Sequence, residues 1–521
     1  MIFITLISML WVESKFQDFI DGIVSDGVYV SKGVYQDQDS GCIEFCKRFD
    51  FNGDGYFDLT SADLAGPYLK IFFGSSQGYS SQNSRLFPVS SGGGVFIADL
   101  NLDTYPELIH AGHQNEYFCK IYWGTPDGPF PNNYTALPNN QAEAVYVHDI
   151  NKDGWLDIIL SGWEPMILTI YFGSKTGYSQ SNSINIYMPY RMVHNLEVAD
   201  INKDGWLDIL ATLPTQAPGN AIIYWGPNNS YTIRWLPLDI FNRHGLSIAD
   251  FDKNGWLDVV CTVWRFGNNA RIFFGSSTGF DSIPTVTLSP GQAYGGSAIW
   301  DFDNDGWLDI LIFNYGNYGL KLYRNIGHYP YFDENNVIII APNIFFSASG
   351  GCVGDFNFDG NVDIWINNLN SYSYVLWGPD YTNYISLPVS SDHHGYFMEI
   401  GNTYDRKFYE EYVSNIFYLG PDSVIKGGTV SWISNEPSGS KVEIYLRGGN
   451  NSQIDTSWTD WIYIQQNGDS IPSPLFDKHY LQYKILFNYE KPTFLPNLEK
   501  ISFNILTSPP SYLNIFPDST S

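Results

Sequence analysis

A nine-residue pattern with an acidic residue at each end occurs seven times in this chain of 521 residues. Successive copies begin 49 to 54 residues apart, and two of them, from Asp149 and from Asp200, are identical. In chain order they read DFNGDGYFD, DLNLDTYPE, DINKDGWLD, DINKDGWLD, DFDKNGWLD, DFDNDGWLD and DFNFDGNVD. A regular period of this length indicates a repeat architecture, in which each unit buries its apolar face against its neighbours.

Each copy lies between two apolar stretches, such as LSIAD before it and LDVVC after it. About 24 residues beyond the first aspartate comes a third apolar run with a turn, as in IFFGSSQGY and IYFGSKTGY, and a fourth run closes the unit. Four short strands in about fifty residues, joined by Gly, Asn and Ser, are typical of one blade of an antiparallel propeller. We therefore predict an all-β fold in which seven blades surround one axis.

The composition agrees with strands and turns. Aromatic residues make up 17% of the chain and charged residues 16%, with 48 Gly and 28 Pro. Such a content favours strands joined by many turns over helices.

The fifty-residue period ends after the seventh unit. From about Tyr404 the sequence shows at least six alternating strand patterns, which predict a C-terminal β-sandwich. The predicted division is an N-terminal segment at 1–25, the propeller at 26–403, the sandwich at 404–508 and a flexible tail at 509–521. The N-terminal segment is apolar at its start, and an export signal and an extra strand both fit it.

The loop and turn together carry a family resemblance. A DxDxDGxxD loop followed by an FG turn resembles the FG-GAP and VCBS repeats of integrin α-chain propellers and bacterial surface proteins, over roughly residues 26 to 400. Two units depart from the pattern. The second has Thr104 in place of Gly and Glu107 in place of the last Asp, and the sixth has LYRN at its turn. We expect these departures to weaken the second metal site and the sixth turn while keeping the architecture.

The loops have the chemistry of a Ca²⁺ site. Ca²⁺ binds six to eight oxygens, and a tight loop offers them from alternate residues. In the third copy, Asp149, Asn151, Asp153 and Asp157 supply side-chain oxygens and Trp155 supplies its carbonyl. An EF-hand begins with similar letters but needs a glutamate at its twelfth position. Here the twelfth position is never acidic, whereas the ninth always is.

The predicted ligands are the first, third, fifth, seventh and ninth residues of each loop, for up to seven Ca²⁺ ions. They are Asp50, Asn52, Asp54, Tyr56, Asp58, Asp99, Asn101, Asp103, Tyr105, Glu107, Asp149, Asn151, Asp153, Trp155, Asp157, Asp200, Asn202, Asp204, Trp206, Asp208, Asp250, Asp252, Asn254, Trp256, Asp258, Asp301, Asp303, Asp305, Trp307, Asp309, Asp355, Asn357, Asp359, Asn361 and Asp363.

The charge balance limits the classes of partner. The formal net charge of −28 repels phosphate backbones, so we expect no nucleic-acid partner. Sites without a twelfth-position glutamate should have dissociation constants of about 10⁻⁴ to 10⁻³ M, in the range of extracellular modules. Such sites fill only where calcium is abundant, which favours an extracellular or cell-surface location. No stretch is apolar for long enough to predict a transmembrane span.

The predicted function is therefore that of a secreted or cell-surface, calcium-binding propeller that serves as a non-enzymatic adhesion, binding or assembly module. Its expected partner is a protein or glycan ligand, and self-association fits as well. Two alternatives stay open, a carbohydrate-binding lectin and a polysaccharide-processing enzyme on a propeller scaffold. A ligand surface could include Arg191, His194, Arg243 and His244, which lie just before two inner strands. We predict no catalytic residue.

Overall fold

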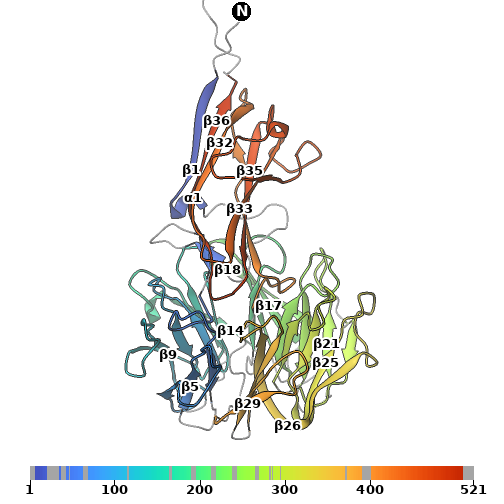
Figure 1. Cartoon of the computed structure of the whole chain (residues 1–521). Helices are drawn as coiled ribbons and strands as arrows, with labels where there is room; N and C mark the ends of the chain where they lie inside the picture. The colour runs from blue at the N-terminus through green and yellow to red at the C-terminus, as the bar shows by residue number, and fades with distance from the viewer. Residues whose placement is uncertain are drawn as a thin grey trace, which may run out of the picture.

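The computed structural model describes residues 6–19, 34–36, 43–45, 47–62, 68–113, 116–162, 167–188, 195–212, 219–237, 243–263, 269–280, 283, 285–293, 295–369, 372–389 and 400–508. Within them the chain forms two parts, a propeller and a sandwich that stands on one of its faces (Figure 1). The predicted all-β propeller fold with a C-terminal sandwich is confirmed.

Each of the seven sequence units supplies one group of antiparallel strands among the described residues. The strands of the first three units are β4 (Leu59–Ala62), β5 (Tyr68–Phe72), β6 (Ser84–Pro88); β7 (Val95–Ala98), β8 (Glu107–His110), β9 (Phe118–Tyr122), β10 (Tyr134–Pro138); β11 (Val145–His148), β12 (Asp157–Leu160), β13 (Ile167–Tyr171) and β14 (Ser183–Tyr187). The strands of the next two units are β15 (Leu196–Ala199), β16 (Asp208–Ala211), β17 (Gly219–Gly226), β18 (Ser230–Pro237); β19 (Arg243–Ala249), β20 (Asp258–Val263), β21 (Ala270–Phe273) and β22 (Val286–Leu288).

The sixth and seventh units share one long strand. The strands of these units are β23 (Ser297–Trp300), β24 (Asp309–Ile312), β25 (Tyr315–Tyr323), β26 (Val337–Gly354), β27 (Asp363–Asn368), β28 (Ser373–Leu376) and β29 (Tyr384–Leu387). The first part of β26 pairs with β25, and its last part, from Ala348, pairs with β27. This strand is therefore the outer strand of one group and the inner strand of the next.

The first strands of successive units lie side by side, with β7 next to β11, then β15, β19, β23 and β26. The first unit in turn packs on the seventh. The rings of Phe57 and Phe358 stack at a centroid distance of 5.4 Å, and Trp365 Nε1 donates to the Thr60 carbonyl at 3.3 Å. Buried side chains of both units form one hydrophobic core. These contacts close the ring.

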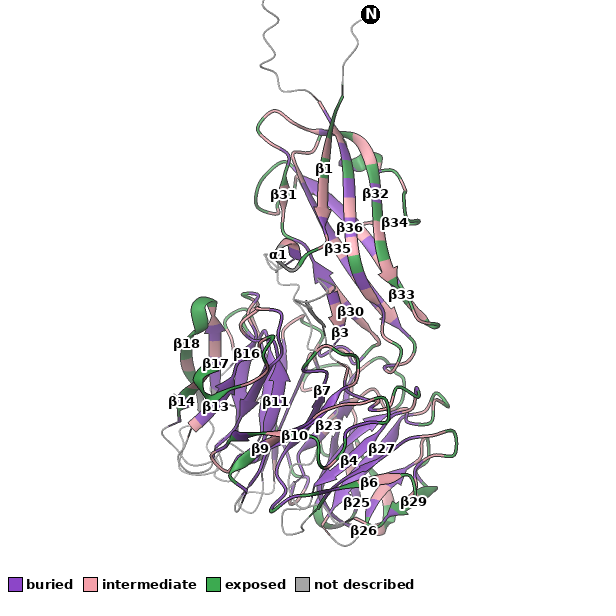
Figure 2. Cartoon of the chain, turned by 90° about the vertical axis from the view of Figure 1, so that its left-hand side faces the viewer, coloured by how far each residue is buried: buried purple, intermediate pink, exposed green. Residues whose placement is uncertain are grey.

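The sandwich has two sheets around a common core. One contains β1 (Ile7–Glu13), β36 (Asn497–Thr507), β32 (Ile425–Asn435), β3 (Ile43–Phe45) and β2 (Val34–Gln36). The other contains β30 (Tyr409–Val413), β35 (Tyr480–Tyr489), β33 (Ser440–Gly449), β34 (Ile462–Ile464) and β31 (Phe417–Tyr418). The inner faces of both sheets are buried (Figure 2).

The N-terminal segment is part of this sandwich. Strand β1 pairs with β36, with Ile7 opposite Thr507 and Glu13 opposite Ile501. The Trp11 ring stacks on Phe417 at 4.5 Å and on Phe503 at 4.6 Å. Strands β2 and β3 also lie in this sheet, although the sequence placed them inside the propeller range that begins at residue 26.

Short helices complete the fold: α1 (Phe16–Phe19), η1 (Gln180–Asn182), η2 (Pro227–Asn229) and η3 (Ser473–Leu475). Within the part of the chain that the structure describes, no helix is long and apolar enough to cross a membrane.

The sandwich stands on the face of the propeller that carries the acidic loops. Thr493 Oγ1 donates to the Gly55 carbonyl of the first loop at 3.1 Å. In the segment that leads into the sandwich, Arg406 Nη2 donates to the Ile248 carbonyl of β19 at 2.7 Å. The Tyr404 carbonyl accepts from the Asp250 amide at 3.1 Å. This segment thus lies against an inner strand and a loop of the propeller.

Candidate metal-binding loops

All seven acidic loops have the same backbone form. The fourth and sixth residues have positive φ in every copy, for example 59° at Lys152 and 85° at Gly154. The sixth residue is glycine in six copies because glycine adopts this conformation without strain. The second copy has Thr104 there with φ 81°, a conformation that is unfavourable for a β-branched residue.

The first aspartate organises each turn. In the third loop, Asp149 Oδ1 accepts from the Asp153 amide at 3.0 Å and Oδ2 accepts from the Gly154 amide at 2.8 Å. The same two bonds form in the other six loops. The side-chain oxygen of the fifth residue accepts from the amide of the seventh in every copy. The loop therefore holds its oxygens in place through its own amides.

The ninth residue connects the loop to the turn between the third and fourth strands. Asp157 Oδ2 accepts from the Ile150 amide at 3.0 Å, and Oδ1 accepts from the Gly173 amide at 2.9 Å. The ninth side chain is almost fully buried and makes this pair of bonds in all seven units, Glu107 included. This bridge ties each acidic loop to the end of the third strand or the turn after it.

The turn glycine has no room for a side chain. A Cβ on Gly173 would lie 2.4 Å from the Leu156 carbonyl oxygen, and one on Gly74 would lie 2.2 Å from that of Phe57. In the sixth unit Asn325 supplies the amide instead, and its side chain donates to the Phe251 carbonyl at 3.0 Å. The sixth turn keeps the bridge despite its different sequence.

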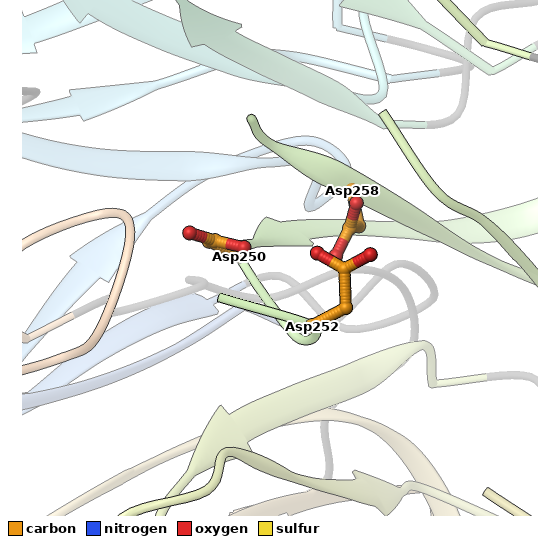
Figure 3. A group of neighbouring side chains, drawn as sticks. All are labelled: Asp250, Asp252 and Asp258. Atoms are coloured by element: carbon orange, nitrogen blue, oxygen red, sulfur yellow. The ribbon is translucent and has the colours of Figure 1, made fainter. Parts of the chain in front are cut away.

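Carboxylate oxygens gather in the fifth and sixth loops. Asp250, Asp252 and Asp258 each offer one oxygen, and these atoms lie within 4.8 Å of one another (Figure 3). Asp301, Asp303 and Asp309 do the same. Two ligands of one Ca²⁺ ion lie at most about 5 Å apart, because each Ca²⁺–oxygen distance is about 2.3 to 2.6 Å. Both groups therefore fit a hard divalent cation.

In the other five loops the third residue is asparagine, whose amide oxygen accepts from the amide of the fifth residue. These loops offer one carboxylate fewer at that position. The structure brings the first, third, fifth and ninth side chains of each predicted site into one loop, and that they coordinate calcium stays a prediction.

Burial makes the charged form of these carboxylates unfavourable. It raises the pKa of Glu107 and of Asp208 to about 8, and that of Asp309 and Asp363 to about 7. The neighbouring carboxylates of the same loop raise these values further, while the amide hydrogen bonds lower them. A bound cation would offset both the burial and the mutual repulsion.

Two loops differ from the others in their side chains. In the sixth, Arg324 forms an ion pair with Asp303, the third residue of the loop. In the second, Thr104 and Glu107 replace the usual Gly and Asp, while the backbone form and the hydrogen bonds stay those of the other loops. The sequence pattern did not predict this ion pair between Arg324 and Asp303.

The contact between the lysine of one loop and the tryptophan of the next was not predicted. The ammonium group of the fourth residue lies over the indole ring of the seventh residue in the next loop: Lys152 over Trp206 at 4.1 Å, Lys203 over Trp256 at 4.5 Å and Lys253 over Trp307 at 3.8 Å. Between the seventh and first loops, the rings of Phe358 and Tyr56 lie 6.4 Å apart. The signal was present in the sequence, since Lys and Trp occur together in consecutive copies.

The side chains of the predicted ligand surface before the inner strands are outside the described residues. Arg191 and His194 are outside the described residues. Arg243 and His244 belong to the backbone of β19, and their side chains are outside the described part.

The comparisons with known proteins agree with the repeat. The FG-GAP-like repeat model matches three times, at residues 200–261, 250–312 and 301–366. Each match begins at the first aspartate of one loop and ends twelve residues into the next. No curated protein matches the chain.

Solved structures share only a distant likeness. One match is a crystal structure of BBS1N in complex with ARL6DN. Its sequence is 13% identical, its TM-score is 0.40, and the match covers 70% of this chain and 93% of the matched chain. A protein from Lactobacillus plantarum is 9% identical, with a TM-score of 0.44, and covers 64% and 96%. An exo-β-1,3-galactanase from Phanerochaete chrysosporium, solved with β-1,3-galactotriose, is 10% identical, with a TM-score of 0.27, and covers 69% and 95%. At these scores we draw no functional argument from them. The FG-GAP-like repeat model thus matches residues 200–366, which contain the fourth to seventh loops, and the first three loops have the same backbone form.

Proposed function

We propose that the acidic loops bind Ca²⁺ and that the protein is a non-enzymatic binding module outside the cell or at its surface. The observation that carries the proposal is the gathering of three carboxylate oxygens within 4.8 Å in the fifth and sixth loops, on a backbone form that all seven loops share.

The proposed role of the ion is structural. The second to seventh loops each join the first two strands of a unit, and the ninth residue of every loop also holds the turn that precedes the last strand of the unit. Repulsion between buried carboxylates opposes this arrangement, and a divalent cation removes that repulsion. Binding to the folded state alone stabilises it by mass action.

The expected affinity supports the location. Sites of this ligand type have dissociation constants of about 10⁻⁴ to 10⁻³ M, so they are filled at extracellular calcium levels. A location outside the cell or at its surface is part of the same proposal.

The hydrogen bonding of the carboxylates supports a non-enzymatic role. A general acid or base must reach a proton on the substrate. The ninth carboxylates are buried and accept two main-chain hydrogen bonds each, so they hold the loop and the turn together.

Thermal unfolding in calcium, in magnesium and in chelator tests the proposal. We expect the melting temperature to rise with calcium by several degrees and to respond much less to magnesium, which requires shorter and more regular octahedral bonds. Equal melting temperatures in calcium and in chelator would remove the structural role of the loops.

A further inference from the structure

The fourth unit has a much shorter connection between its third and fourth strands than the units around it. Only residues 227–229 separate β17 from β18, whereas residues 73–83 and 172–182 fill this place in the first and third units. In those two units the connection folds back over the acidic loop. There the Tyr79 hydroxyl donates to the Phe57 carbonyl at 2.9 Å and the Tyr178 hydroxyl donates to the Leu156 carbonyl at 2.6 Å.

A groove of about 550 Å³ lies where the fourth unit lacks this connection. Its lining includes Asn202 and Asp204 of the fourth loop and Tyr231 and Arg234 of β18. Trp256 and the turn at 276–279 of the fifth unit also line it. The volume is within the range of about 300 to 1,000 Å³ that small-molecule sites occupy.

The aromatic side chains of the groove are held in place. The Tyr231 ring is 41% exposed and stacks on the buried Trp225 ring, at a centroid distance of 5.9 Å and an interplanar angle of 9°. Lys203 fixes the Trp256 ring through its ammonium group at 4.5 Å. Rigid aromatic faces favour binding because little side-chain freedom is lost when a ligand stacks on them.

The remaining lining is rich in hydroxyl and amide groups. Thr232, Ser277 and Thr278 are exposed at the groove, and the Asn202 side chain, which also lines it, is hydrogen-bonded to Asp204. Flat apolar faces beside closely spaced donors and acceptors suit a ring whose face is made of C–H groups and whose edge carries hydroxyls.

We infer that the groove between the fourth and fifth units binds a neutral hexose ring of a saccharide. A neutral ring is favoured over an acidic one because the lining holds one carboxylate, Asp204, beside one cation, Arg234, and the chain carries a net charge of −28. The inference rests on the proposed role as a binding module and gives that module a ligand class. Asn202, Asp204 and the Trp256 carbonyl are also predicted calcium ligands, so the binding measurements are made in excess calcium.

Saturation-transfer NMR and calorimetric titration with the methyl glycosides of galactose, glucose, mannose and fucose test the inference on the full chain. Sorbitol serves as the probe that has hydroxyls but no ring. We expect saturable millimolar or tighter binding of at least one glycoside and none of sorbitol. Removing one stacking ring by Tyr231→Ala should weaken binding about tenfold.

Ser277→Trp provides a second variant, because it fills the groove from an exposed turn and removes no packed side chain. It should abolish binding. Tyr187→Ala is the matched control, since this tyrosine is 66% exposed on the outer strand of the third unit and does not line the groove. It should bind as the unchanged protein does.

The inference is overturned if no glycoside saturates, if sorbitol binds equally well, or if Ser277→Trp and Tyr187→Ala bind alike. The calcium-dependent melting shift of the same samples separates the two proposals. A normal calcium-dependent rise in melting temperature without sugar binding refutes only the saccharide site in the groove. If calcium does not raise the melting temperature, the structural role of calcium is refuted.

Discussion

Replacing Asp157 by alanine should destabilise the propeller even when no calcium is present. The carboxylate accepts from the Ile150 amide at 3.0 Å and from the Gly173 amide at 2.9 Å, and both amides belong to buried residues. A buried donor left without an acceptor destabilises a protein by about 1 to 3 kcal/mol. Two such donors give about 2 to 6 kcal/mol. Burial raises the pKa of Asp157 well above its usual value, so the alanine also removes an unfavourable buried acid, and we expect the lower half of this range.

Urea denaturation in chelator, followed by tryptophan fluorescence, measures the effect. Asp157→Asn keeps one acceptor oxygen, so only one donor loses its partner and the expected loss is about 1 to 3 kcal/mol. Asp127→Ala is the control, because this aspartate is exposed on a turn of the second unit. A loss below about 1 kcal/mol for Asp157→Ala in chelator would mean that the bridge between loop and turn contributes little, against the role assigned to the ninth residue.

Four further predictions concern pH, strain, loop contacts and the N-terminal strand. Since burial raises the pKa of Glu107 and Asp208 to about 8, the folded state keeps these protons after the unfolded chain has lost them near pH 4. The calcium-free protein should therefore lose stability as pH rises from about 4 to 8, and calcium should flatten this dependence in a series of thermal melts. Thr104→Gly should stabilise the protein by about 0 to 2 kcal/mol, because it relieves the strain at φ 81° at some cost in chain entropy; destabilisation in urea would contradict the strain argument. A double-mutant cycle of Lys152→Met and Trp206→Leu should give a coupling of about 0.5 to 2 kcal/mol, and a value near zero would remove the contact between loops. Trp11→Ala should destabilise the sandwich by about 2 kcal/mol or more, since the ring stacks on Phe417 and Phe503, and an unchanged sandwich transition would argue against β1 as an integral strand.

Much of the fold was predictable because the repeat is regular. The spacing of the first aspartates and the apolar runs around them predicted both the strand groups and the loops that connect them. The place of the candidate ligand oxygens was predictable as well, because each nine-residue loop contains all the oxygens of its own site.

Contacts between segments that are far apart in the sequence could not be predicted from the local patterns. Nothing in the local sequence of Ile7–Glu13 indicates that its partner is Asn497–Thr507, almost the full chain length away. The closure of the ring through Phe57, Phe358 and Trp365 likewise depends on pairs that no single unit contains.

The exception in the fourth unit was visible but not interpreted. The sequence IYWGPNNSY has the aromatic residues and the glycine of its neighbours and lacks the residues that would form their longer turn. The bridging amide shifts to Trp225, one residue before that glycine. Only the three-dimensional arrangement shows that this shortening opens a groove beside the next unit.

The number of calcium ions bound per chain tests the central claim most directly. Equilibrium dialysis of chelator-treated protein against increasing calcium, with circular dichroism to confirm that the protein stays folded, gives this number. We predict several bound ions, up to one for each of the seven loops, with half-saturation at about 10⁻⁴ to 10⁻³ M. Less than one bound ion per folded chain at about 10 mM calcium would contradict the account.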